Sequence, residues 1–195
     1  VEHTAHAPVH LFHPVAVDAV RRFARERLAG INRKVHRVVR QVDEEGLVLV
    51  RRDELLVAYY ENPEPMPGAL ELIAALHEAG IKIAVASSSH QHLVNRAVTG
   101  LDVRHAVDAV VAHGHPEVVN LKPAPDLYLV ALAELGVEPT HGLAIEDSPT
   151  GSRAALAAGL RTIVVASDWT RDREFPDGVT HVTSLHDVRI TPHTR

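Results

Sequence analysis

Apolar residues recur at two different spacings along the chain, and the change of spacing divides it. Over residues 15–60 they recur every three to four positions, with Arg and Lys between them, which is typical of amphipathic helices. From residue 69 onward, helical patterns alternate with short, continuously apolar runs. The Pro-rich segment 62–68 separates the two patterns, because closely spaced prolines suit neither a helix interior nor a central strand. The pattern predicts a small helical subdomain followed by an α/β domain.

The second part is predicted to alternate helices with strands. Helices are expected at 69–79, 91–98, 125–135 and 150–158, and strands at 81–86, 106–112, 142–145 and 162–166. Gly80, Gly136 and Gly159 follow three of these helices, where glycine commonly ends a helix. Continuous apolar strands alternating with helices indicate an α/β fold with a Rossmann-like, mostly parallel sheet and helices on both faces. Ligands of such sheets bind beyond the carboxyl ends of the strands.

The first residues are rich in His and Pro. Their four histidines fall at spacings of three and four, which would place them on one face of a helix as metal ligands. Pro8 interrupts such a helix, so we expect a flexible, solvated segment instead. The predicted organisation is a flexible segment at 1–14, a helical cap subdomain at 15–62 and an α/β core at 63–195.

Composition narrows the possible functions. The chain is 46% hydrophobic over 195 residues, enough for a substantial core. Its formal net charge of −5 disfavours nucleic acid as a partner, because affinity for a polyanion comes mainly from basic residues. No apolar run is long enough to cross a membrane, and the absence of cysteine fits a reducing compartment. We therefore expect a cytoplasmic protein without membrane contact; its oligomeric state stays open.

Candidate phosphate-binding groups lie beside two of the predicted elements. Ser87 directly follows the strand at 81–86, so its hydroxyl and the N–H groups of Ser88 and Ser89 are expected to face a ligand at the start of a helix. Lys122 precedes the helix that begins at 125, and its ammonium can reach the same space. The ordinary alternative is that the serines only cap a helix and that the lysine belongs to a common loop.

Two adjacent acids follow the strand at 142–145. Glu146 and Asp147 come at the carboxyl end of this strand, near the expected phosphate site. Magnesium takes one or two protein carboxylates and keeps several waters, so the pair predicts a magnesium site. Acids are also common at the start of a helix. Three independent strand ends or helix starts with suitable groups make a joint site the better interpretation.

Three motifs resemble those of the haloacid dehalogenase superfamily of phosphoryl-transfer enzymes. They are Val-Ala-Ser-Ser-Ser at 85–89, Leu-Lys-Pro-Ala-Pro-Asp at 121–126 and Ala-Ile-Glu-Asp-Ser-Pro-Thr-Gly at 144–151. The resemblance covers about residues 65–166 and is closest to the β-phosphoglucomutase and phosphoglycolate phosphatase branch. That branch carries a helical cap between its first and second motifs, where the helical pattern of this chain lies.

The resemblance also suggests a substrate contact in the cap. Gly-Ile-Asn-Arg at 30–33 is similar to the loop with which such caps bind the distal phosphate of the substrate. Arg33 would bind that phosphate, since a guanidinium can form two parallel hydrogen bonds to it. Alternatively, Arg33 belongs to a basic, solvated helix face.

One motif of the family is missing. Its first motif, Asp-x-Asp, supplies the aspartate that becomes phosphorylated and a general acid and base. No Asp-x-Asp occurs in the sequence, and the comparable apolar run at 8–12 is followed by His-Pro-Val. Either the chain is an N-terminally truncated form, which we favour, or it is a degenerate member without turnover.

The resemblance implies a magnesium-dependent phosphatase or phosphomutase acting on a small phosphorylated metabolite such as a sugar phosphate. Ser87 and Lys122 would be catalytic, Arg33, Ser88 and Ser89 would bind substrate, and Glu146 and Asp147 would hold Mg2+. The alternative is an inactive phosphate-binding or interaction module.

Overall fold

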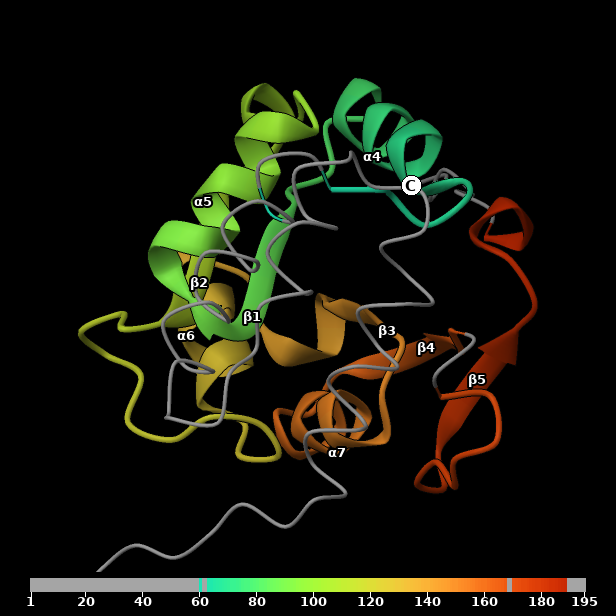
Figure 1. The fold of residues 1–195 in the computed structure, drawn as a ribbon. Coiled ribbons are helices and arrows are strands. Elements are labelled where there is room, and N and C mark those ends of the chain that lie inside the picture. The colour runs from blue at the N-terminus through green and yellow to red at the C-terminus, as the bar shows by residue number, and fades with distance from the viewer. Residues whose placement is uncertain (1–59, 61–62, 168–169, 189–195) are drawn as a thin grey trace, which may run out of the picture. The chain divides into compact units, whose positions relative to one another are not determined.

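A computed structural model describes Tyr60 and residues 63–167 and 170–188 (Figure 1). The chain divides into two compact units, Val1–Ala58 and Tyr59–Arg195, and all described residues belong to the second. The predicted flexible segment lies outside the described residues, as does the predicted cap apart from Tyr60. None of the helices within the described ranges has the length and hydropathy of a membrane span.

The described unit alternates helices and parallel strands, as the sequence predicts. Its helices are α4 (Ala69–Glu78), α5 (Gln91–Gly100), α6 (Asp126–Leu135) and α7 (Pro149–Ala157). Its strands are β1 (Ala84–His90), β2 (Ala109–His113), β3 (Leu143–Glu146), β4 (Arg161–Val165) and β5 (Val179–Val182). The eight predicted elements are all present, and the three predicted helix-ending glycines have positive φ angles of 68°, 63° and 83°. The short strand β5, half exposed, was not predicted.

The boundaries of β1 differ from the prediction. The strand was expected at 81–86 with Ser87 directly after it, but it begins at Ala84 and ends at His90. It begins late because the N–H of Ile83 donates to the Asp108 carboxylate at 2.8 Å. It ends late because the backbone stays extended beyond the regular pairing with β2, which shifts register between Ser87 and His90. The polar run of serines therefore lies within the strand rather than after it.

The strands form two parallel sheets. One has the order β1-β2 and the other the order β3-β4-β5. Among the described strands, β1 pairs only with β2, and β3 pairs only with β4. Direct pairing of β1 with β3 is therefore absent among the described strands.

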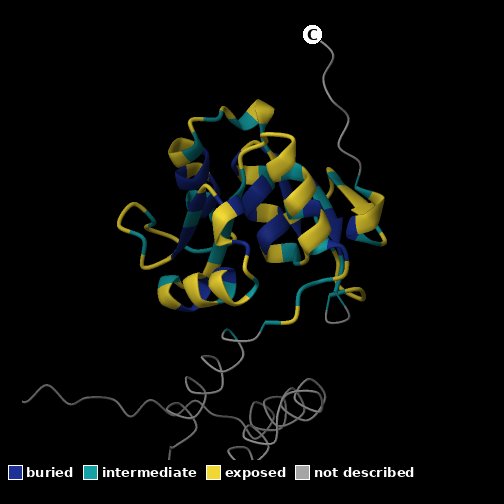
Figure 2. Cartoon of the chain, turned by 90° about the horizontal axis from the view of Figure 1, so that it is seen from above, coloured by how far each residue is buried: buried dark blue, intermediate teal, exposed yellow. Residues whose placement is uncertain are grey.

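Helices cover both faces of the β1-β2 sheet. Val94 and Val98 of α5 pack in one cluster with Ala112 of β2, whereas Leu127 of α6 packs in another with Val111. Neighbouring residues of a strand point to opposite faces, so α5 and α6 must lie on opposite faces of the sheet. Figure 2 shows the buried segments, in dark blue, gathered where the helices and strands face one another. This is the layered arrangement that the apolar pattern predicts.

A third cluster connects the two sheets. It joins Tyr128 and Leu132 of α6 with Ala144 of β3 and with small residues of α7, and Ala86 of β1 packs against it. The residues of α7 at this contact include Ala154 and Ala155, which are fully buried. Their small side chains permit close packing of α7. The cluster therefore packs α6 against both β1 and β3.

We predict that an added strand stabilises this fold. Fusing an apolar segment that ends in Asp-x-Asp ahead of residue 1 should raise the melting temperature, because unpaired buried backbone groups cost about 1 to 3 kcal/mol each. Thermal melts measure the change, and a Gly/Ser-rich extension of equal length is the control. Equal, sharp and reversible transitions in both extended proteins would show that the sheets gain nothing from that strand.

Candidate functional site

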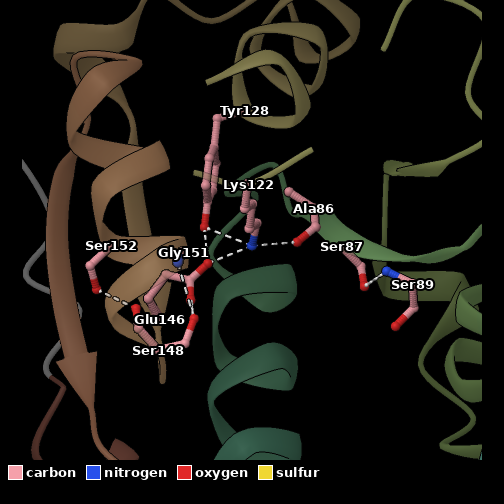
Figure 3. Close-up of polar contacts among 9 residues, drawn as sticks. All are labelled: Ala86, Ser87, Ser89, Lys122, Tyr128, Glu146, Ser148, Gly151 and Ser152. Atoms are coloured by element: carbon pink, nitrogen blue, oxygen red, sulfur yellow. Dashed lines mark hydrogen bonds and ion pairs between the residues drawn. The ribbon is translucent and has the colours of Figure 1, made fainter. Parts of the chain in front are cut away.

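Lys122 joins the ends of the two sheets. Its ammonium donates to the carbonyl oxygen of Ala86 in β1 at 2.9 Å and to Oε1 of Glu146 in β3 at 2.5 Å. Figure 3 shows this ammonium between the two residues, with the hydroxyl of Tyr128 beside it at 3.3 Å. The side chains of Lys122 and Glu146 are only 13% and 6% exposed. The structure thus brings the predicted lysine and the first predicted acid together as a buried ion pair.

Glu146 accepts hydrogen bonds on both of its carboxylate oxygens. Tyr128 donates its hydroxyl proton to Oε1, which Lys122 also contacts, and Ser148 donates to Oε2 at 3.2 Å. A buried carboxylate requires such partners, because an unpaired one would carry a large desolvation penalty. Glu146 is therefore held in one orientation, toward Lys122.

The turn after β3 is built around this carboxylate. Ser148 caps α7 by accepting a hydrogen bond from the N–H of Gly151 at 3.1 Å, and Pro149 occupies the first helical position. A Cβ on Gly151 would overlap the carboxylate of Glu146. Glycine is needed here for close approach rather than for an unusual backbone angle. The Ser-Pro-Thr-Gly part of the motif at 144–151 thus has a local purpose, which is to hold the Glu146 carboxylate in place.

Asp147 directly follows Glu146, the last residue of β3. It is exposed, while Glu146 is buried, as expected for neighbouring residues of extended backbone. Thr170 donates its hydroxyl to the backbone carbonyl of Asp147 at 2.5 Å and accepts from the N–H of Ser167 at 3.0 Å. The segment after β4 therefore fixes the backbone of Asp147. Within the described ranges, no three His, Cys, Asp or Glu side chains converge as a metal site.

The serines of β1 bind mainly to one another and to Tyr60. The N–H of Ser89 donates to the hydroxyl of Ser87 at 3.1 Å, and the hydroxyl of Ser89 lies 2.7 Å from that of Tyr60. Ser88 is exposed. Ser87 directly follows Ala86, the residue whose carbonyl oxygen Lys122 contacts, but it lies within β1 rather than after the strand as predicted. The N–H of Ser89 is turned toward Ser87 and does not face a ligand in this arrangement.

The loop that carries Lys122 is fixed by Asp126. Its carboxylate accepts from the backbone N–H groups of Asn120 at 2.8 Å and of Val119 at 3.2 Å. These contacts, with that of Asn120 first, lower the pKa of Asp126. Asp126, the last residue of the motif at 121–126, therefore has a structural purpose, because it closes the loop just before Lys122.

Sequence reasoning missed Tyr128. This residue lies in α6 and is 9% exposed, and it contacts both members of the ion pair. Burial, and then the negative charge of Glu146, raises the pKa of its hydroxyl, which keeps its proton. A signal was present, because a tyrosine within an otherwise apolar helix generally has a partner for its hydroxyl. Arg33, the predicted cap residue, lies outside the described residues.

Three comparisons relate the chain to known proteins. The model of a family described as "Hydrolase: haloacid dehalogenase-like hydrolase" matches residues 2–159. Protein CbbY of Cereibacter sphaeroides is 43% identical over 112 residues, which are 56% of this chain and 48% of that protein. Hexitol phosphatase B of Escherichia coli K12 is 33% identical over 134 residues, which are 68% and 60% of the two chains.

A solved structure agrees with these matches. A point mutant of CbbY from Rhodobacter sphaeroides, in complex with xylulose-(1,5)bisphosphate, superimposes with a TM-score of 0.66 at 29% identity, covering 88% of this chain and 89% of the other. In the sequence comparisons, however, the chain spans only about half to three fifths of the curated relatives' length.

The buried ion pair predicts a large cost for removing its cation. Lys122→Met should lower the free energy of unfolding by about 3 to 5 kcal/mol, because it leaves the Glu146 carboxylate buried and unpaired. The exposed lysine Lys82, whose ammonium donates to the carbonyl oxygen of Leu135 at 2.6 Å, is the matched control, and its change to Met should cost at most about 1.5 kcal/mol. Urea denaturation measures both. Adding Glu146→Gln to Lys122→Met should recover part of the lost free energy of unfolding, because it removes the unpaired charge. If Lys122→Met and Lys82→Met lower the free energy of unfolding equally, the ion pair does not have this importance.

The raised pKa of Tyr128 predicts a stability change at alkaline pH. The folded protein keeps the hydroxyl proton where the unfolded chain loses it, so this stabilisation is complete below the unfolded pKa of about 10 and declines as the pH rises above it. The free energy of unfolding, relative to that of Tyr128→Phe, should fall by about 1.4 kcal/mol per pH unit there. Urea titrations between pH 8 and 11 test this, and a difference that stays constant to pH 11 would disprove it.

Proposed function

Since the chain belongs to the haloacid dehalogenase-like hydrolase family, we propose that its site serves magnesium-dependent phosphoryl transfer on a small phosphorylated metabolite. The observation that carries this proposal is the position of Lys122, whose ammonium contacts Ala86 within β1 and Glu146 at the carboxyl end of β3. Ligands of parallel sheets bind at this edge. A fixed positive charge there suits the negative charge that develops on a transferred phosphoryl group.

Glu146 and Asp147 would hold the magnesium ion. Their carboxylate oxygens are the hard ligands that Mg2+ prefers, and a site with one or two protein carboxylates leaves the remaining positions to water. Asp147 is the more accessible ligand, since its side chain is exposed and its backbone is fixed by Thr170. Glu146 would have to share its carboxylate with the hydrogen bonds from Lys122, Tyr128 and Ser148. When bound, the ion would neutralise charge on the phosphoryl oxygens.

Lys122 and the serines would hold the phosphate. Ser87 follows the residue that Lys122 contacts, so its hydroxyl lies on the same strand end as the ammonium. Ser88 and Ser89 would complete this side, with the N–H of Ser89 leaving Ser87 for the ligand. Arg33 remains a proposed contact to a second phosphate on the substrate.

A sugar phosphate is the proposed substrate class. The relatives described above include a hexitol phosphatase and a protein crystallised with a sugar bisphosphate. The sequence does not distinguish a phosphatase from a mutase. A cytoplasmic location is part of the proposal and fits the absence of cysteine.

The missing nucleophile leaves two candidate functions for this site. The sequence has no Asp-x-Asp, so the family's aspartyl-phosphate would need a carboxylate that this sequence does not offer in that motif. The second candidate function, favoured by this observation, is a phosphate-binding module without turnover.

An assay of phosphate release distinguishes the phosphoryl-transfer enzyme from the binding module. We expect the 195-residue chain to release negligible phosphate from sugar phosphates, and the same chain with an apolar strand ending in Asp-x-Asp ahead of residue 1 to release it in a magnesium-dependent manner. The matched control carries Asn-x-Asn in the added strand. Activity of the unextended, pure chain would overturn the assignment of the nucleophile, while inactivity of all three proteins would favour the binding module.

Magnesium binding tests the acid pair without turnover. Calorimetry should detect weak binding to the chain that Asp147→Ala reduces at least about tenfold, since the substitution removes the exposed ligand. Asp177→Ala, which removes an exposed acid from a different segment, should leave binding unchanged. Equal binding by the wild type and the Asp147 variant would rule the metal assignment out.

A further inference from the structure

The ammonium of Lys122 has no hydrogen-bond donor left over. It carries three N–H groups, and the chain supplies three acceptors: the carbonyl oxygen of Ala86, Oε1 of Glu146 and the hydroxyl oxygen of Tyr128. Two of these contacts are short, at 2.9 and 2.5 Å, whereas the contact to Tyr128 is 3.3 Å. The third acceptor is therefore the most weakly held, and it is the only neutral side chain among the three.

The direction of the Tyr128 hydroxyl follows from its partners. Its single proton is donated to Oε1 of Glu146, so its oxygen is left to accept from Lys122. Tyr128 thus binds the anion of the pair as a donor and the cation as an acceptor. No other hydroxyl described in the structure contacts both members of this pair.

The ring of Tyr128 adds a second contact. The Nζ of Lys122 lies 4.8 Å from the ring centroid, within the distance of a cation–π interaction. The ring itself belongs to the core cluster that joins α6, β3 and α7, with Leu132 and Ala154 among its members. The support for the ammonium is therefore part of the packed core.

We propose that Tyr128 is a positioning residue that holds the Lys122 ammonium between Ala86 of β1 and Glu146 of β3 through its hydroxyl and its ring. The hydroxyl contact is the one that a phosphate oxygen replaces, because a charged acceptor binds an ammonium more strongly than a neutral one. Lys122 then donates to the phosphate oxygen in place of the Tyr128 hydroxyl, while its hydrogen bonds to Ala86 and Glu146 remain. This second step rests on the proposed function; the positioning itself does not.

NMR of lysine side chains tests the positioning directly. The lysines are Lys34, Lys82 and Lys122, so 15Nζ-labelled protein gives few signals, and loss of one signal in Lys122→Arg assigns it. In Tyr128→Phe, which keeps the ring and removes the hydroxyl, the Lys122 ammonium protons should exchange with water about tenfold faster than in the wild type, as expected for one lost hydrogen bond. Leu132→Val, which alters the same core cluster, should leave this exchange rate within about twofold.

The outcomes separate this proposal from the proposed function. Unchanged exchange in Tyr128→Phe, equal acceleration in both variants, or an unprotected Lys122 signal in the wild type would each overturn the positioning role. Inorganic phosphate, added with Mg2+, should shift the Lys122 signal in the wild type and should do so at a several-fold lower concentration in Tyr128→Phe, because the hydroxyl contact that phosphate replaces is already gone. A signal that phosphate leaves unmoved in every variant would reject the phosphate site, while the exchange rates still decide the role of Tyr128.

Discussion

The described structure depends on one buried ion pair, between Lys122 and Glu146. The lysine comes from the loop before α6 and the glutamate from the end of β3, and the ammonium also binds the last regular part of β1 through Ala86. Two sheets that do not pair with each other in the described part of the chain are thereby joined at their carboxyl ends. A buried charge is costly unless it is paired and hydrogen-bonded, so each contact of the pair constrains the others. This constraint explains the surrounding sequence: Gly151 gives the carboxylate room, Ser148 binds its second oxygen, and Asp126 closes the loop that delivers the lysine.

The same constraint relates stability to function. The groups proposed to bind phosphate and magnesium are, without ligand, satisfied by one another. A phosphate oxygen or a metal ion must therefore replace contacts that already exist, and the strength of binding is the difference between the new contacts and the old ones. Asp147 is the exception on the acid side, because its side chain is exposed while Thr170 fixes its backbone. This arrangement fixes the positions of Lys122 and Glu146, because their hydrogen bonds are made within the protein before any ligand binds.

Much of this could be predicted from the sequence. The alternation of apolar runs and helical patterns indicated the order and type of eight elements, because burial on both faces of a parallel sheet requires continuous apolar strands. The motifs led to Lys122 and Glu146, and the family that they indicated is confirmed by the match over residues 2–159. Three things could not be derived. The extension of β1 through the serines depends on a register shift with β2, β5 is too short and exposed to show a clear pattern, and the role of Tyr128 depends on the packing of α6 against β3 and α7. Each is set by contacts between residues distant in sequence, which local patterns do not record.

The most direct test is a crystal structure of the chain grown with Mg2+ and tungstate, a tetrahedral oxyanion that stands in for phosphate. We expect the anion within hydrogen-bonding distance of Lys122 Nζ and Ser87 Oγ, a cation bound by Asp147, and the Lys122 contact to Tyr128 replaced while those to Ala86 and Glu146 remain. An anion bound elsewhere, with Lys122 still contacting Ala86, Tyr128 and Glu146, would contradict the central claim that these strand ends form a phosphoryl-binding site.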